Sequence, residues 1–272
     1  MLGEILLNVI VQLVYFVGAV FLIGWLMAKL NQAFYRLTGG GMAVCVATGA
    51  LGTPIHELSH AAMCLVFGHR IHEIKLFQIG DEDGVLGYVS HSYNKKNIWA
   101  VIGNYFIGIA PIIGGSGAIF LLISWFLPDA YTVISSLLSD FASMQSGGFN
   151  AEWFEGIGTV CLGMIAALFS NVSIGLGFWI FYIVAMCIAL HVTLSGADIK
   201  GALPALPILA GALLVINLFL GLLLPSAYVG FLAGINSFGG YLIGLMCLSV
   251  VLSLSCFVIL FLVRLVIGFF TR

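Results

Sequence analysis

Charged side chains are scarce in this sequence. Nine Lys or Arg and eleven Asp or Glu make 20 charged residues in a chain of 272, or 7%. A soluble domain carries roughly a quarter of its residues as charged ones. The scarcity excludes a soluble globular protein and a disordered chain, and the lack of a basic patch excludes nucleic acid as a partner.

Paired cysteines are absent as well. The six cysteines show no spacing such as Cys-x-x-Cys, and all of them lie in apolar runs. We therefore interpret them as small buried hydrophobic side chains, with neither a disulfide framework nor a cysteine-built metal site. They are Cys45, Cys64, Cys161, Cys187, Cys247 and Cys256.

Long apolar runs make up most of the sequence. Hydrophobic residues make up 62% of the chain, and the mean hydropathy is +1.18. Several runs are long enough to cross the hydrocarbon core of a bilayer. We expect an all-α polytopic membrane protein with about six transmembrane helices, forming one membrane-embedded domain over residues 1–272. The expected spans are 5–30, 42–68, 98–127, 174–194, 203–224 and 238–267.

Two segments between the spans differ in character. Residues 74–79 and 85–89 predict two strands, and Gly80-Asp-Glu-Asp-Gly84 predicts the turn of a β-hairpin between them. Residues 128–171 carry acidic side chains and no Lys or Arg. The apolar part of that segment, 156–169, is short for a span and favours an interfacial or re-entrant helix.

The distribution of Lys and Arg predicts the orientation. With six spans, the hairpin, Lys200 and the C-terminal arginines fall on one side, which we expect to be the cytoplasm. The acidic segment 128–171 then falls outside. Lys29 and Arg36 also fall outside, against the rule, so the first span is the weakest part of this topology. The cytoplasmic cations are Arg70, Lys75, Lys95, Lys96, Lys200, Arg264 and Arg272.

The second span contains the motif His56-Glu57-Leu58-Ser59-His60, which is His-Glu-x-x-His. Helical residues i and i+4 share a face, so both imidazoles can bind one Zn²⁺ with Glu57 as the base. Random placement of six His and six Glu would yield about 0.003 such motifs. The alternative is a polar cluster between helices, but three ionisable groups within a span are costly unless they serve a function.

A catalytic zinc ion needs a third protein ligand and an open position. A third histidine six residues after His60 is excluded, because Val66 stands there. Asp198 lies beside the fourth span, where we expect it at the depth of the motif. Its alternative role is an interfacial cap paired with Lys200. His191, two helical turns earlier, is either a hydrogen-bonded core histidine or another ligand.

These residues resemble the site-2 protease family of intramembrane zinc metalloproteases over about residues 40–201. That family has a span with His-Glu-x-x-His, a cytoplasmic β-hairpin, a second core span, and a third span that brings an Asp ligand. The resemblance implies a catalytic core at 40–201 and one zinc ion per chain. It also implies that His56, His60 and Asp198 are the ligands and that Glu57 is the base.

Two features depart from the family pattern. Asp198 is followed by Ile-Lys-Gly, whereas the family usually has Asp-Gly. The family's Gly-Pro-x-x-Asn corresponds to Ala110-Pro111-Ile-Ile-Gly114, which keeps the proline and loses the asparagine. Asn104 is the candidate for supplying the missing amide to a substrate. An interhelical hydrogen bond is its alternative role.

The expected function is zinc-dependent hydrolysis of peptide bonds in membrane proteins, within or beside the bilayer. An edge strand of the hairpin would pair with an unwound substrate segment, or the hairpin would merely cover the site. Two other classes stay open: a membrane metalloenzyme that is not a protease, and a zinc-binding scaffold or transporter. Glu57 weighs against the last, because a structural site needs no base. The sequence leaves the substrate and the oligomeric state open.

Overall fold

The computed structural model describes residues 2–80, 84–145, 152–170 and 175–270. It is 84% helical with one small antiparallel sheet of two strands, which agrees with the predicted helical membrane protein carrying a β-hairpin. Four helical stretches of the described chain are long and apolar enough to cross a membrane. They are Leu2–Thr38, Ile98–Phe126, Gly196–Leu223 and Pro225–Phe270.

The described part of the chain consists of helices and one pair of strands. In chain order they are α1 (Leu2–Leu13), the π-helical stretch η1 (Val14–Ala19), α2 (Val20–Thr38), α3 (Met42–Val66), β1 (Arg70–Lys75), β2 (Tyr88–Ser92), α4 (Ile98–Phe126), α5 (Pro128–Gln145), α6 (Glu152–Ser170), α7 (Leu176–Ala189), α8 (Gly196–Ala202), the 3₁₀ turn η2 (Leu203–Ala205), α9 (Leu206–Leu223) and α10 (Pro225–Phe270).

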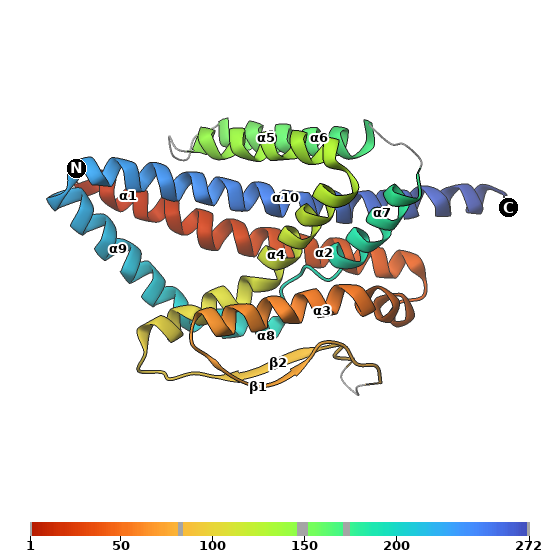
Figure 1. Ribbon diagram of the computed structural model, residues 1–272, viewed down its shortest axis with the longest axis horizontal. Coiled ribbons are helices and arrows are strands. Elements are labelled where there is room, and N and C mark those ends of the chain that lie inside the picture. The colour runs from red at the N-terminus through yellow and green to blue at the C-terminus, as the bar shows by residue number, and fades with distance from the viewer. Residues whose placement is uncertain (1, 81–83, 146–151, 171–174, 271–272) are drawn as a thin grey trace.

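Three layers are visible in Figure 1. The paired helices α5 and α6 lie along one side of α10, and α2 lies along another part of it. The hairpin of β1 and β2 packs against α3 at the opposite side of the molecule. Helix α4 crosses obliquely between these layers and contacts α3, α7, α8 and α10. Helix α4 therefore joins the layer that carries the motif to the other layers.

The predicted span 42–68 is one continuous helix, α3, with Pro54 inside it. Other predicted boundaries are corrected. The strands lie at 70–75 and 88–92 instead of 74–79 and 85–89, because pairing starts beside the helices, at Arg70 and Ser92. The helix expected at 174–194 is described from Leu176 and ends at Ala189. Residues 81–83 of the predicted turn, and 171–174, lie outside the described part.

The acidic segment also differs from the prediction. Instead of a single short helix at 156–169, α5 and α6 form a helical pair. Ile134, Leu138 and Phe141 of α5 are buried, and an added Cβ at Gly244 of α10 would meet Leu138. The apolar face of α5 thus packs against α10, whereas the sequence prediction for this segment rested on its acidic residues. Residues 146–151 lie outside the described part.

Small residues of α4 allow close approach of α3 and α8. A Cβ added at Gly114 would collide with the Ser59 side chain of α3. A Cβ added at Gly108 would lie 2.7 Å from the carbonyl oxygen of Asp198 on α8. Such close backbone packing through small residues is typical of helices in membranes. It places α8 directly beside the helix that faces the motif.

A buried amide of α2 stabilises the end of α7. The Asn31 Nδ2 atom donates hydrogen bonds to the carbonyl oxygens of Ala189 and Leu190, at 3.3 and 2.8 Å. The last carbonyls of a helix lack partners within the helix. Asn31 satisfies two of them and holds the non-helical residues that follow, 191–195, in place.

Replacing Gly108 should therefore destabilise the packing of α8 on α4. We expect Gly108→Ala to lower the free energy of unfolding by about 1–3 kcal/mol, since the new methyl group overpacks a filled contact. Gly117→Ala in the same helix is the control, because its Cβ would meet nothing within 4 Å. Denaturant unfolding of the purified protein in detergent measures both. Equal stability of the two variants would contradict the packing described.

Candidate metal centre

The structure brings His56, His60 and Asp198 together. The two histidines lie one turn apart on α3, and Asp198 comes from the first turn of α8. The Nε2 atoms of His56 and His60 are 3.2 Å apart. Asp198 Oδ1 is 3.2 Å from His60 Nε2, and Asp198 Oδ2 is 3.9 Å from His56 Nε2. One ligand atom from each residue thus lies within 4.8 Å of those of the other two.

Backbone carbonyls orient both imidazoles. His56 Nδ1 lies 2.9 Å from the carbonyl oxygen of His191, and His60 Nδ1 lies 2.7 Å from that of Ile107. A carbonyl oxygen only accepts, so each Nδ1 carries the hydrogen and each Nε2 presents a lone pair in the neutral ring. Metal-binding histidines are typically held in this way by their second nitrogen.

The Asp198 carboxylate is held by a capping box. Ser195 is the N-cap of α8: its hydroxyl accepts from the Asp198 amide at 3.0 Å, and its own amide donates to Asp198 Oδ2 at 2.7 Å. The prediction that Asp198 lies at the end of the fourth apolar helix is therefore corrected. The capping box starts a new helix, and the carboxylate both caps it and faces the histidines. The ion pairs of Asp198 within the described chain are with His56 and His60.

The spacing of the three donors fits a tetrahedral metal ion. Zn–N bonds of 2.0–2.1 Å place two ligand atoms of a tetrahedral site about 3.3 Å apart. The two Nε2 atoms are 3.2 Å apart and His60 Nε2 is 3.2 Å from Asp198 Oδ1, both close to this value, while His56 Nε2 is 3.9 Å from Asp198 Oδ2. Two imidazoles and one carboxylate are a donor set for zinc and related divalent transition metals. Three protein ligands leave one coordination position for water or substrate.

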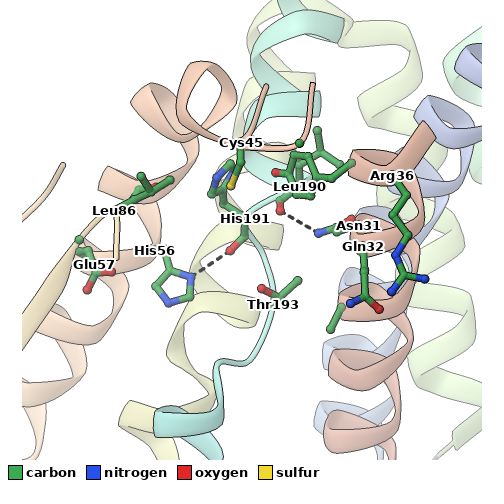
Figure 2. Close-up of a pocket in the computed structure, with 15 residues that line it drawn as sticks. Asn31, Gln32, Arg36, Cys45, His56, Glu57, Leu86, Leu190, His191 and Thr193 are labelled. Atoms are coloured by element: carbon green, nitrogen blue, oxygen red, sulfur yellow. Dashed lines mark hydrogen bonds between the residues drawn. The ribbon is translucent and has the colours of Figure 1, made fainter. Parts of the chain in front are cut away.

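Glu57 lies between two cavities that meet at the motif. A cavity of about 550 Å³ extends from His56 and Glu57 toward α2, and one of about 420 Å³ extends toward β2, α4 and α8. Figure 2 shows His56 and Glu57 on one side of the larger cavity, with Asn31, Gln32 and Arg36 of α2 on the other. Glu57 is only 5% exposed. Its carboxylate thus borders both spaces from which a substrate could reach the histidines.

The other two predicted candidates have different positions. Asn104 lines the smaller cavity, and its amide nitrogen donates to the Val101 carbonyl within α4. The side chain of His191 lies outside the three-donor group, and its Nδ1 donates to the Cys187 carbonyl at 3.0 Å. His191 acts instead through its own carbonyl, which orients His56.

Sequence reasoning missed the backbone carbonyls of His191 and Ile107 and the side chain of His91. A main-chain acceptor leaves no residue-type signal, so only the fold reveals it. His91 on β2 lines the smaller cavity beside His60 and Asp198. Burial, followed by the neighbouring imidazole of His69, lowers the pKa of His91.

Comparison with known proteins assigns no family. No protein-family model matches the chain, and neither the curated proteins nor the solved structures give a match. The chemistry of this site is therefore the basis for assigning a function.

Asp198→Asn tests the third ligand. The substitution removes the negative charge and keeps the shape, so we expect metal affinity at this group to fall by more than the roughly 10–100-fold loss typical of an outer contact. Lys200→Ala, an exposed position on the same helix, should leave affinity unchanged. Zinc competition with a chromophoric chelator measures both variants, with His60→Ala as the reference for a lost site. Wild-type affinity in Asp198→Asn would exclude Asp198 as a ligand.

Proposed function

We propose that this protein is an intramembrane zinc metalloprotease that hydrolyses peptide bonds of membrane proteins. One observation carries the proposal. The Nε2 atoms of His56 and His60 are 3.2 Å apart, while both Nδ1 atoms face carbonyl oxygens. Two nitrogen lone pairs at this distance repel each other unless a proton or a metal cation lies between them, and the Asp198 carboxylate beside them makes the group suited to a cation.

The ligands and Glu57 have distinct roles in the proposed reaction. Zn²⁺ held by His56, His60 and Asp198 would act as a Lewis acid on the scissile carbonyl and acidify the attacking water. Glu57 takes a proton from that water and delivers it to the leaving amine. Burial of Glu57 shields this proton transfer from bulk solvent. The carbonyls of His191 and Ile107 keep the two imidazoles in the tautomer that binds metal.

The surroundings of the motif suit an extended peptide. A peptide bond within a transmembrane helix is shielded by hydrogen bonds and must be unwound before attack. The smaller cavity is lined by Val85, Gly87 and Val89, which belong to β2 and the residues before it. In the sheet formed by the described residues, β2 pairs with β1. An unwound substrate segment would lie along β2 in this cavity and across Glu57.

Glu57→Gln tests the protease activity. We expect zinc content to stay at the wild-type value and cleavage to fall by about 10²–10⁴-fold, because the variant keeps the ligands and loses the base. Glu73→Gln on the exposed face of β1 is the matched control and should cleave normally. The assay follows a panel of single-span proteins in vesicles, with fragments identified by mass spectrometry.

Two results would contradict the proposal. Cleavage by Glu57→Gln at the wild-type rate would exclude Glu57 as the base. If the zinc-loaded wild-type protein left every single-span protein intact but hydrolysed lipids in the same vesicles, the site would belong to an enzyme of another class.

The proposed topology has six crossings, with the hairpin and the metal centre facing the cytoplasm. Lys95 after β2 and Asp140 on α5 are both exposed. We expect a membrane-impermeant maleimide to label Lys95→Cys from the cytoplasmic side and Asp140→Cys from the opposite side, with the unsubstituted chain as background. Labelling of both from one side would mean that α5 and α6 each cross the membrane. Such a pair of extra crossings leaves the sides of the later helices unchanged.

A further inference from the structure

A second group of potential metal ligands lies beside the hairpin. Cys64 is in the last turn of α3, His69 is in the turn before β1, and His91 is on β2. The Cys64 sulfur and one ring nitrogen of each histidine all lie within 4.8 Å of one another. Cys64 is fully buried and His69 is 5% exposed. The proposed protease reaction uses none of these three side chains.

A backbone carbonyl orients His69 as it does His56 and His60. His69 Nε2 lies 2.8 Å from the carbonyl oxygen of Ala100 in the first turn of α4, so Nε2 carries the hydrogen. The Nδ1 of His69 then presents its lone pair, and it lies 3.0 Å from Nδ1 of His91. A carbonyl on one ring nitrogen and a second ligand facing the other is the arrangement of a metal-binding histidine.

The register of the hairpin brings His91 to this point. Ile71 pairs with His91 and Glu73 with Ser90, so His72 is left out of the pairing as a bulge. A bulge redirects the side chains of its strand pair. His72 is exposed and contacts the Ser92 hydroxyl, whereas His91 reaches His69. A two-stranded sheet is marginally stable by itself, and this contact joins it to the helices.

We infer that Cys64, His69 and His91 form a second zinc site that fastens β2 to the end of α3 and the start of α4. One sulfur and two imidazole nitrogens suit Zn²⁺, and the absence of a carboxylate from the group argues against Mg²⁺ and Ca²⁺. Cys64 would bind as the thiolate, releasing its proton to solvent. The interpretation of all six cysteines as merely apolar is revised at this position.

Two residues of the second site, Cys64 and His91, lie close to the first site. Cys64 follows His60 by one helical turn on α3, and His91 lines the cavity that also contains His60 and Asp198. A metal ion at the second site would make β2 a rigid wall of that cavity. The inference itself does not depend on the proposed protease activity, because its ligands and its measurements are separate.

Zinc content of the full-length protein, purified in detergent, tests the inference. The wild-type protein should hold about two zinc ions per chain, and Cys64→Ser, His91→Ala and His60→Ala about one each. The double variant with Cys64→Ser and His60→Ala should hold none. His72→Ala, the exposed neighbour on β1, should keep two. A wild-type chain with a single zinc ion, lost in His60→Ala, would overturn the second site.

Cobalt substitution distinguishes the two sites spectroscopically. Only a thiolate ligand produces a sulfur-to-cobalt charge-transfer band in the near ultraviolet, and the first site contains no sulfur. We expect the band in the wild-type protein, in His60→Ala and in Cys256→Ser, and its loss in Cys64→Ser. A band that persists in Cys64→Ser would exclude Cys64 as the thiolate ligand, and a band absent from the wild-type protein would leave the His69–His91 pair as a hydrogen bond only; either result would overturn the second site.

Retention of the first zinc ion shows that a variant is folded. If Cys64→Ser loses both ions because it misfolds, His91→Ala decides the question, since His91 is half-buried on the hairpin and outside the helical core. A His91→Ala protein that keeps two zinc ions would overturn the inference. Absence of proteolysis together with a cobalt–thiolate band would sink the proposed function and leave the second site standing.

Discussion

Two hydrogen bonds from imidazole to backbone carbonyl are the interaction on which the candidate metal centre depends. The carbonyls of His191 and Ile107 hold the Nδ1 atoms of His56 and His60, so both Nε2 atoms face inward. One carbonyl comes from the segment between α7 and α8, and the other from α4. The centre therefore exists only while α3 stays packed against both, which the small residues of α4 permit.

The non-helical segment 190–195 is the second element that the site requires. In a membrane protein, irregular backbone is tolerated where other protein groups satisfy it or where it lines a cavity. Both conditions hold here. Asn31 of α2 binds the carbonyls of Ala189 and Leu190, and His191 and Thr193 line the larger cavity. The break also allows Ser195 to start α8 and to hold the Asp198 carboxylate toward the histidines.

The hairpin borders the metal centre and is held to the helices by a contact between two histidines. Its strand β2 borders the smaller cavity, while His91 contacts His69, whose ring is held by the first turn of α4. The same chemical device, a ring nitrogen fixed by a carbonyl, thus occurs at both candidate metal groups. A hairpin anchored in this way holds β2 at the wall of the cavity that Glu57 also lines.

The sequence by itself determined the membrane character, the helical class and the His-Glu-x-x-His pair, because these depend on composition and on spacing within one helix. It also pointed to Asp198 beside the fourth span, but did not show that Asp198 belongs to a separate helix, α8, because composition does not reveal where a capping box starts a new helix. Only the tertiary structure decided three further features. They are the carbonyls of His191 and Ile107, the packing of α5 on α10, and the Cys64–His69–His91 group. Each of them joins residues from different elements, and main-chain acceptors and long-range contacts carry no signature in the local order of side chains.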